Sequence, residues 1–202
     1  MHKLKVISST TRPGRKGPAL TAWLAAIARQ HPEFEVEVLD LAEINLPMMN
    51  EPFHPKLQKY QHEHTRQWSA TIAEADAFVM VTAEYNSGIP APLKNALDYL
   101  GKEWAHKPVA IVSYGGVSAG TRSAQMLKSV LATLKMVPLV ETVAIPFFDQ
   151  FINGQGVFVP NPISEKAAHD MVAELFRWAT ALKPLRSPSP ATQPAGAAPV
   201  VA

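Results

Sequence analysis

The stretch Thr82–Asp98, TAEYNSGIPAPLKNALD, determines the fold that we expect for this chain. It follows the apolar run Ala77–Val81, which is typical of a buried strand, and it continues as a helix near Pro92. A sharp turn at Asn86 separates the two elements. Open α/β sheets bind their ligands in polar loops at the carboxyl ends of buried strands. The sequence therefore predicts a ligand-binding loop here.

The side chains of this loop indicate the shape of the ligand. Tyr85 offers a flat apolar face, and Glu84, Asn86 and the backbone amides near Ser87 offer hydrogen bonds. A planar ligand with a polar edge fits this combination. The alternative is that Tyr85 only packs on the edge of the sheet.

The composition limits the class of protein. The chain has 202 residues, 47% of them apolar, which is enough for one well-buried α/β core. A formal net charge of +2 does not indicate a nucleic-acid binder. The absence of cysteine excludes a disulfide framework, Cys-ligated zinc, iron–sulfur clusters and thiol catalysis. With no secretory signal and no apolar run long enough to span a bilayer, we expect a soluble cytoplasmic protein without a membrane partner.

Hydrophobic periodicity divides the chain into alternating strands and helices. We expect strands at Leu4–Ile7, Glu33–Leu39, Ala77–Thr82, Val109–Ser113 and Leu139–Ile145. We expect helices at Pro18–Gln30, Leu57–Ala75, Pro92–Leu100, Ala119–Leu134 and Glu165–Leu182. This alternation predicts an α/β three-layer sandwich with a five-stranded parallel sheet in the flavodoxin-like order 2-1-3-4-5.

Helical spacing also predicts which side chains are buried. The expected stripes are Tyr60, His64, Trp68 and Ile72, then Met126, Val130 and Leu134, and finally Met171, Leu175, Trp178 and Leu182. Ser164 is the expected cap of the last helix. Residues 1–183 form the predicted domain, and residues 184–202, with five prolines and no periodicity, are predicted to be a disordered tail. A swapped arm on a partner subunit is the alternative for this tail.

In a sheet of this order, the loops after the first, third and fourth strands meet at one crevice. The first of these loops, Ser8–Gly17, has four consecutive hydroxyl residues and three cations, and it leads into a helix N-terminus. Hydroxyls, helix amides and a bidentate Arg12 suit a phosphate monoester. Neither a Walker A loop nor a G-x-G-x-x-G motif is present, because Pro18 follows Gly17. A solvated basic turn is the alternative.

The loop after the fourth expected strand, Ser113–Ser123, contains three glycines. Glycines let the backbone approach a flat ligand closely. Any tight turn uses glycines, so this loop indicates a ligand site only together with the other two loops.

Four segments on these loops resemble the NADPH-dependent FMN reductase family, flavodoxin-like flavoenzymes that include chromate, quinone and azo-dye reductases. They are TRPGR at Thr11–Arg15, EYN at Glu84–Asn86, PLKNALDY at Pro92–Tyr99 and SYGGVSAG at Ser113–Gly120. The resemblance covers roughly residues 4–182. It implies a bound FMN, NAD(P)H as the co-substrate, and a homodimer or homotetramer whose flavin site is completed by the neighbouring subunit.

The resemblance also implies which residues hold the FMN. The first loop binds the phosphate through Thr10, Arg12, Arg15, Lys16 and Gly17. The second loop lines the isoalloxazine through Glu84, Tyr85, Asn86 and Ser87. The glycine-rich loop holds the dimethylbenzene and ribityl side through Ser113, Tyr114, Gly115, Gly116 and Gly120.

The chain departs from the family pattern at three places. Ser9-Thr10 stands where the family usually has Gly-Ser, and Ala83 stands where it usually has proline. Ser87-Gly88 follows the EYN triplet, where many members have Tyr-Gly or Gly-Ser. A missing aromatic there leaves more room over the flavin, so we expect substrate choice to be decided in this segment.

The function that this resemblance implies is hydride transfer from NAD(P)H to FMN N5 and then to a small-molecule acceptor, by a ping-pong mechanism and with no catalytic side chain. The acceptor classes are flavins, quinones, azo compounds and metal oxyanions. A non-enzymatic flavin module, an electron carrier or sensor, is the alternative, and a phosphate-ester enzyme is a third hypothesis.

The remaining histidines and tryptophans have structural interpretations. His62 and His64 lie two positions apart, on different sides of a helix, so no metal site is predicted. Trp23, Trp68 and Trp178 are expected in the core. The helix Pro92–Leu100 is the expected subunit surface, with Asp98 and Tyr99 as contacts and Trp104 at the boundary.

Overall fold

A computed structural model describes residues 1–186, and a parallel sheet forms its centre. The strands are β1 (His2–Ser8), β2 (Phe34–Asp40), β3 (Ala77–Ala83), β4 (Pro108–Tyr114) and β5 (Val137–Ile145). All neighbouring strands are parallel, in the order β2-β1-β3-β4-β5. The predicted fold class and strand order are therefore confirmed.

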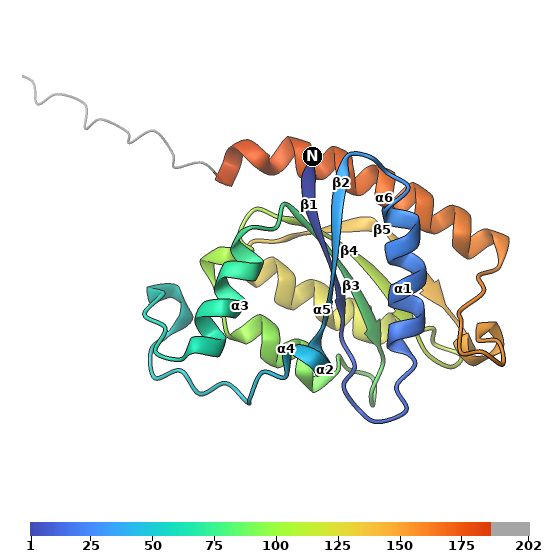
Figure 1. Ribbon diagram of the computed structural model, residues 1–202, viewed down its shortest axis with the longest axis horizontal. Helices are drawn as coiled ribbons and strands as arrows, with labels where there is room; N and C mark the ends of the chain where they lie inside the picture. Colours follow the sequence, from blue (N-terminus) through green and yellow to red (C-terminus); the bar gives the residue numbers. More distant parts are fainter. Residues whose placement is uncertain (187–202) are drawn as a thin grey trace, which may run out of the picture.

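Helices cover both faces of this sheet (Figure 1). On one face lie α1 (Gly17–Ala28) and α6 (Pro162–Leu182). On the other face lie α3 (Glu63–Ala73), α4 (Ala91–Asp98) and α5 (Thr121–Thr133). The short helix α2 (Leu41–Ile44) follows β2 directly. No helix in the described part of the chain has the length and apolar character needed to cross a membrane.

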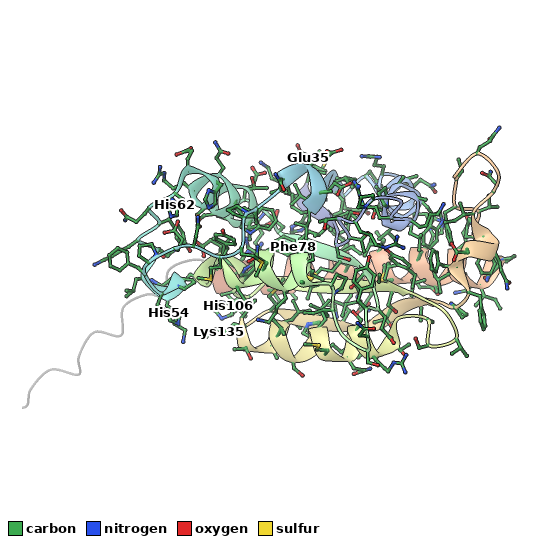
Figure 2. All side chains as sticks on the ribbon, turned by 90° about the horizontal axis from the view of Figure 1, so that it is seen from below. Glu35, His54, His62, Phe78, His106 and Lys135 are labelled. Carbon is green, nitrogen blue, oxygen red and sulfur yellow. The ribbon has the colours of Figure 1, made fainter. Side chains whose placement is uncertain are left out.

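The sheet separates two apolar cores, and β3 contributes to both. Val79 and Val81 belong to the core under α1 and α6, whereas Phe78 and Met80 belong to the core under α3, α4 and α5. This division follows from the strand geometry, because successive side chains point to opposite faces. Figure 2 shows Phe78 inside the molecule. Burial on both faces explains why β3 is apolar throughout, as parallel strands commonly are.

The predicted helix Leu57–Ala75 begins six residues too early. Leu57 ends a short 3-10 helix, and α3 begins at Glu63. The tertiary structure overrides the helical periodicity here, because the buried Glu103 carboxylate accepts hydrogen bonds from Tyr60 Oη (2.8 Å) and Gln58 Nε2 (3.1 Å). Tyr60 therefore lies outside the helix that was expected to carry it.

Two predicted buried stripes are also partly wrong. On α5, Leu127 and Leu131 are buried, whereas Met126 is 47% exposed. On α6, Met171 and Leu175 are buried as predicted, but Trp178 is 39% exposed. Ala179, four residues after Leu175 and next to Trp178, takes the core position on α6.

The last helix also begins differently from the prediction. Asn161, not Ser164, is its N-cap, and the Asn161 side chain accepts a hydrogen bond from Ser164 N at 2.8 Å. Pro162 occupies the first turn, where its missing N–H costs nothing.

Two expected subunit contacts are instead part of this chain's own core. Trp104 is fully buried, with its ring 5.1 Å from that of Phe78 and its Nε1 donating to the Leu97 carbonyl. Tyr99 is also fully buried, and its hydroxyl donates to the Pro47 carbonyl at 3.0 Å. Neither side chain is available at the surface of the folded chain.

The described residues include the start of the predicted tail, residues 184–186. Lys183–Arg186 form a 3-10 helix, and Arg186 donates to the Asp76 carboxylate at 2.5 Å. The rest of the predicted tail, 187–202, lies outside the described residues.

Candidate functional site

The loops that follow β1, β3 and β4 surround one cavity of about 280 Å³ at the carboxyl end of the sheet. Nine residues of the predicted site line this cavity: Thr10, Arg12, Arg15, Lys16, Glu84, Tyr85, Tyr114, Gly115 and Gly116. Ala83, Phe148 and Asp149 line it as well, without having been predicted. Five predicted residues do not line it: Gly17, Asn86, Ser87, Ser113 and Gly120.

The first loop contains polar groups that lack protein partners. Within residues 1–186, the buried hydroxyls of Ser8 and Ser9 form no hydrogen bond. Arg12 is exposed, and its guanidinium contacts only the neighbouring Pro13 carbonyl, at 3.4 Å. Lys16 is the exposed N-cap residue of α1. Of these groups, Arg12 and Lys16 line the cavity, so two cations at the N-terminus of α1 form a candidate anion-binding position.

Gly17 does not line the cavity, but it allows α1 to begin close to Thr10 and Tyr114. A Cβ at Gly17 would lie 2.6 Å from Thr10 Oγ1 and 2.8 Å from Tyr114 Oη. Real Cβ atoms essentially never come this close, so a side chain at position 17 would force Thr10, Tyr114 or α1 to move. The helix N-terminus, with its free amides, is thereby held against the cavity.

Arg15 differs from Arg12 in having a protein partner. Its guanidinium donates to the Asp40 carboxylate at 2.8 Å, and both side chains are largely buried. Asp40 ends β2 and also accepts from Ala42 N at 2.9 Å, so it caps α2. Arg15 therefore ties the first loop to β2 as well as lining the cavity.

Glu84 lines the cavity, and its carboxylate also bonds to groups of the chain itself. The carboxylate accepts from Ser118 Oγ at 3.1 Å, from Arg122 N at 3.2 Å and from Arg122 Nε at 2.5 Å. The Arg122 guanidinium, followed by these other donors, holds the pKa of Glu84 below its usual value. Glu84 thus connects the loop after β3 to the loop after β4 and caps α5.

The turn after Glu84 is tight and places Tyr85 at the cavity. Tyr85 and Gly88 exchange backbone hydrogen bonds of 3.0 and 2.9 Å. The two residues between them, Asn86 and Ser87, both have positive φ, 49° and 65°. Asn tolerates this conformation better than Ser does. The turn directs Tyr85, which is 38% exposed, into the lining, while Asn86 and Ser87 lie outside it.

Tyr114 crosses from the glycine-rich loop to the first loop. Its hydroxyl lies 3.4 Å from Thr10 Oγ1, and burial raises the pKa of this phenol to about 12. Gly115 and Gly116 complete the wall, whereas Gly120 has a packing role. At φ +77°, a Cβ on Gly120 would lie 2.7 Å from Tyr114 N. Ser113 is buried in β4.

Two of the three unpredicted residues come from the segment after β5. Phe148 and Asp149 lie in an irregular connection for which the sequence offers no periodic signal. A hint was available in its position, because this connection follows a strand next to β4 and so begins at the same edge of the sheet. No cluster of metal-ligating side chains occurs among the described residues.

Fold and site together define a flavodoxin-like protein with a cation-lined cavity at the carboxyl end of its sheet. The flavoenzyme NAD(P)H:(acceptor) oxidoreductase FerB from Paracoccus denitrificans has a similar structure. The TM-score is 0.74 at 21% sequence identity, and the match covers 90% of this chain and 98% of FerB.

Sequence comparison identifies the family. The model for NADPH-dependent FMN reductases matches residues 2–150. An NAD(P)H-dependent FMN reductase of Schizosaccharomyces pombe is 39% identical over 171 residues, which are 83% of this chain and 82% of that protein. An NADPH:quinone oxidoreductase of Arabidopsis thaliana is 32% identical over 108 residues, 49% of this chain and 50% of that protein. The chain belongs to the NADPH-dependent FMN reductase family, whose members are enzymes that use FMN and NAD(P)H.

Proposed function

We propose that this protein binds FMN in the 280 Å³ cavity and transfers hydride from NAD(P)H, through FMN, to a small-molecule acceptor. One observation carries the proposal. The cavity combines Arg12 and Lys16 of the first loop, which form no ion pair among residues 1–186, with an aromatic side chain and glycines on the opposite loops. A ligand in which a phosphate monoester is joined to a planar ring is complementary to both parts of this cavity.

The residues present fit FMN. Arg12 and Lys16 have free cationic groups for a phosphate, and Gly17 keeps the α1 amides close to it. Tyr85 supplies a flat face, and the side-chain-free Gly116, beside which a Cβ would meet nothing within 4 Å, leaves space for a ring. We assign Asn86 and Ser87 to the rim, where their backbone amides support the edge of the ring.

FMN supplies the redox chemistry, since its flavin ring accepts a hydride and passes it on. The role of the protein is to bind the FMN and to orient it. Arg12 and Lys16 neutralise the phosphate, and Glu84 holds the loops on either side of the ring at a fixed separation through Arg122. No side chain is assigned as a catalytic acid or base. NAD(P)H and the acceptor need the same open side of the cavity in turn, so we expect ping-pong kinetics.

An absorbance spectrum of the purified protein, followed by NADH and NADPH titrations, tests this function. We expect a yellow protein, or a colourless one that takes up FMN, and steady oxidation of NAD(P)H with a quinone, an azo dye, free flavin or chromate as the acceptor. Parallel lines in double-reciprocal plots indicate the ping-pong scheme. A protein that stays colourless after FMN is added contradicts the proposal.

A non-enzymatic flavin carrier or sensor is the second candidate. Electron-carrier flavodoxins are typically acidic, whereas this chain has a net charge of +2. The two functions differ in one assay. The isolated enzyme oxidises NAD(P)H continuously when an acceptor is present, whereas a carrier needs a separate reductase.

We also propose that the chain forms a homodimer or homotetramer in the cytoplasm. Large apolar side chains are exposed on the connection between α2 and α3, and Met48 is 75% exposed, Leu57 56% and Phe53 45%. Figure 2 shows His54 and His62 of this connection at one end of the molecule. Light scattering coupled to gel filtration measures the assembly, and the double substitution F53E/L57E is expected to shift it toward monomer.

A further inference from the structure

The connection from β5 to α6 supplies a wall of the flavin cavity with its own chemistry. Phe148 and Asp149 line the cavity that also contains Arg12 and Lys16. A carboxylate cannot accept a hydrogen bond from an ionised phosphate, and the two anions repel each other. Asp149 therefore needs a different part of the ligand as its partner.

The connection is held firmly against the glycine-rich loop. Phe147 N donates to the Gly116 carbonyl at 3.1 Å, and Phe148 N donates to the Gly115 carbonyl at 3.4 Å. Phe147 has a left-handed backbone with φ +47°, a conformation that a bulky residue adopts only where its surroundings enforce it. The Phe148 ring packs edge-on against Tyr114 with 4.9 Å between centroids. Asp149 is thus presented by a fixed turn.

The Asp149 carboxylate is free to accept hydrogen bonds. Within residues 1–186, no donor forms a hydrogen bond or ion pair with it, although three cations line the same cavity. Arg15 is already paired with Asp40. The side chain is also exposed, so forming a bond to a ligand costs little desolvation.

The contacts of the connection indicate which part of a ligand Asp149 faces. Phe147 and Phe148 bond to the glycine-rich loop, and Asp149 lines one cavity with the cations of the first loop. Asp149 therefore has access to the part of a ligand that lies between the glycine-rich loop and the phosphate-binding cations. In FMN, the secondary hydroxyls of the ribityl chain lie between the phosphate and the ring.

We propose that Asp149 accepts hydrogen bonds from the ribityl hydroxyls of FMN and that Phe148 packs against the same chain. Hydroxyl groups are donors that a carboxylate binds strongly. This inference rests on the proposed FMN site and adds a selectivity to it. Among flavin phosphates, the protein recognises those with a hydroxylated chain.

A double-mutant cycle between protein and ligand tests the inference. The apoprotein is titrated, by flavin fluorescence or calorimetry, with FMN and with the 10-(5-phosphopentyl) isoalloxazine that keeps ring and phosphate but lacks the secondary hydroxyls. Wild type is expected to bind FMN about tenfold more tightly than the pentyl analogue. In Asp149→Ala this preference is expected to fall below about twofold, with the Kd of the analogue unchanged.

Asp170→Ala is the matched control. Asp170 is an exposed aspartate on α6 that pairs with Lys166 outside the cavity, so this variant is expected to keep the wild-type preference. Equal changes for both ligands in Asp149→Ala, or tighter binding of FMN alone, overturn the inference, because the carboxylate then acts only through charge or folding. A wild-type protein that binds neither flavin overturns the proposed function itself, which is a separate and recognisable result.

Discussion

The two ends of the sheet differ in how their polar groups are satisfied. At the carboxyl end, Ser8 and Ser9 have buried hydroxyls without partners among residues 1–186, and Arg12 pairs with no carboxylate there. At the amino end, Lys107 Nζ donates to the carbonyls of Ile72 at 2.6 Å and Ala73 at 2.9 Å. At the carboxyl end Arg15 and Arg122 are paired with carboxylates, whereas Arg12 and Lys16 form no ion pair among residues 1–186.

By volume alone, the ligand site would be assigned to the amino end of the sheet. The amino end has a cavity of about 400 Å³, larger than the 280 Å³ cavity of the candidate site. Its lining includes Lys107, Asp76 and Arg186, all of which bond to protein groups. A large cavity with satisfied walls offers a ligand little binding energy, so unsatisfied polar groups locate the site better than volume does.

Arg12→Ala is expected to weaken FMN binding more than the other substitutions do. Losing charge-assisted bonds to the phosphate costs about 1.5–3 kcal/mol, which weakens FMN binding about 10- to 100-fold. Riboflavin, which lacks the phosphate, is expected to bind both proteins equally in fluorescence titrations. Arg15→Ala is the comparison variant, and its effect should be smaller because Arg15 is already paired with Asp40. Equal losses for FMN and riboflavin speak against a phosphate contact.

Gly17→Ala is expected to have the second-largest effect on FMN binding. The added Cβ lies within 3 Å of Thr10 Oγ1 and Tyr114 Oη, so either these two cavity-lining side chains or the start of α1 must move. Such overpacking costs about 1–3 kcal/mol, here as weaker FMN binding together with a lower Tm. Gly154→Ala is the control, since a Cβ there meets nothing within 4 Å. Unchanged binding in Gly17→Ala means that the helix N-terminus does not contact the phosphate.

Glu84→Gln tests the connection between the loop after β3 and the loop after β4. The amide keeps the shape but loses the charge opposite Arg122, so we expect FMN binding to weaken about threefold to tenfold, in line with about 1 kcal/mol for a weakened charged bond. Arg122→Ala should have the same effect, and the double variant should be no worse than either single one. Additive losses indicate that Glu84 contacts the ligand directly.

Lys107→Met is expected to leave the site unchanged. Burial, together with the Arg186 charge, lowers the pKa of the Lys107 ammonium from 10.5 to about 8. Because the folded state holds this proton less tightly than the unfolded state, the contribution of Lys107 to stability rises from pH 8 to pH 10.5 and is lost below pH 8. Thermal melts across this range should show a flatter pH profile for the variant. A change in FMN affinity contradicts the separation of the two ends.

The sequence was sufficient to predict the sheet order and three of the loops at the site. Strand burial and loop composition are local properties, and parallel topology brings the loops after β1, β3 and β4 together wherever the helices end. The roles of individual side chains were harder to predict. Glu84 was expected at the ligand site and does line the cavity, but its carboxylate also bonds to Arg122 on α5, a contact that only the folded chain creates.

Phe148 and Asp149 were missed for a related reason. Their approach to the cavity depends on the left-handed turn at Phe147 and on backbone bonds to Gly115 and Gly116. Phenylalanine carries no sequence signal for such a turn, unlike glycine or asparagine. The conformation is imposed by neighbouring strands, so it can be seen only in three dimensions.

The anchor of Arg186 on Asp76 has a practical consequence. Asp76 immediately precedes β3, so the last described residues are fixed at the end of the sheet opposite the cavity. A linker joined at Arg186 therefore fastens the protein to a bead or an electrode with its cavity facing the solution. An immobilised layer made this way is expected to keep full access for dissolved nucleotides and dyes, whereas random coupling through surface lysines, which include Lys16, is expected to block part of it.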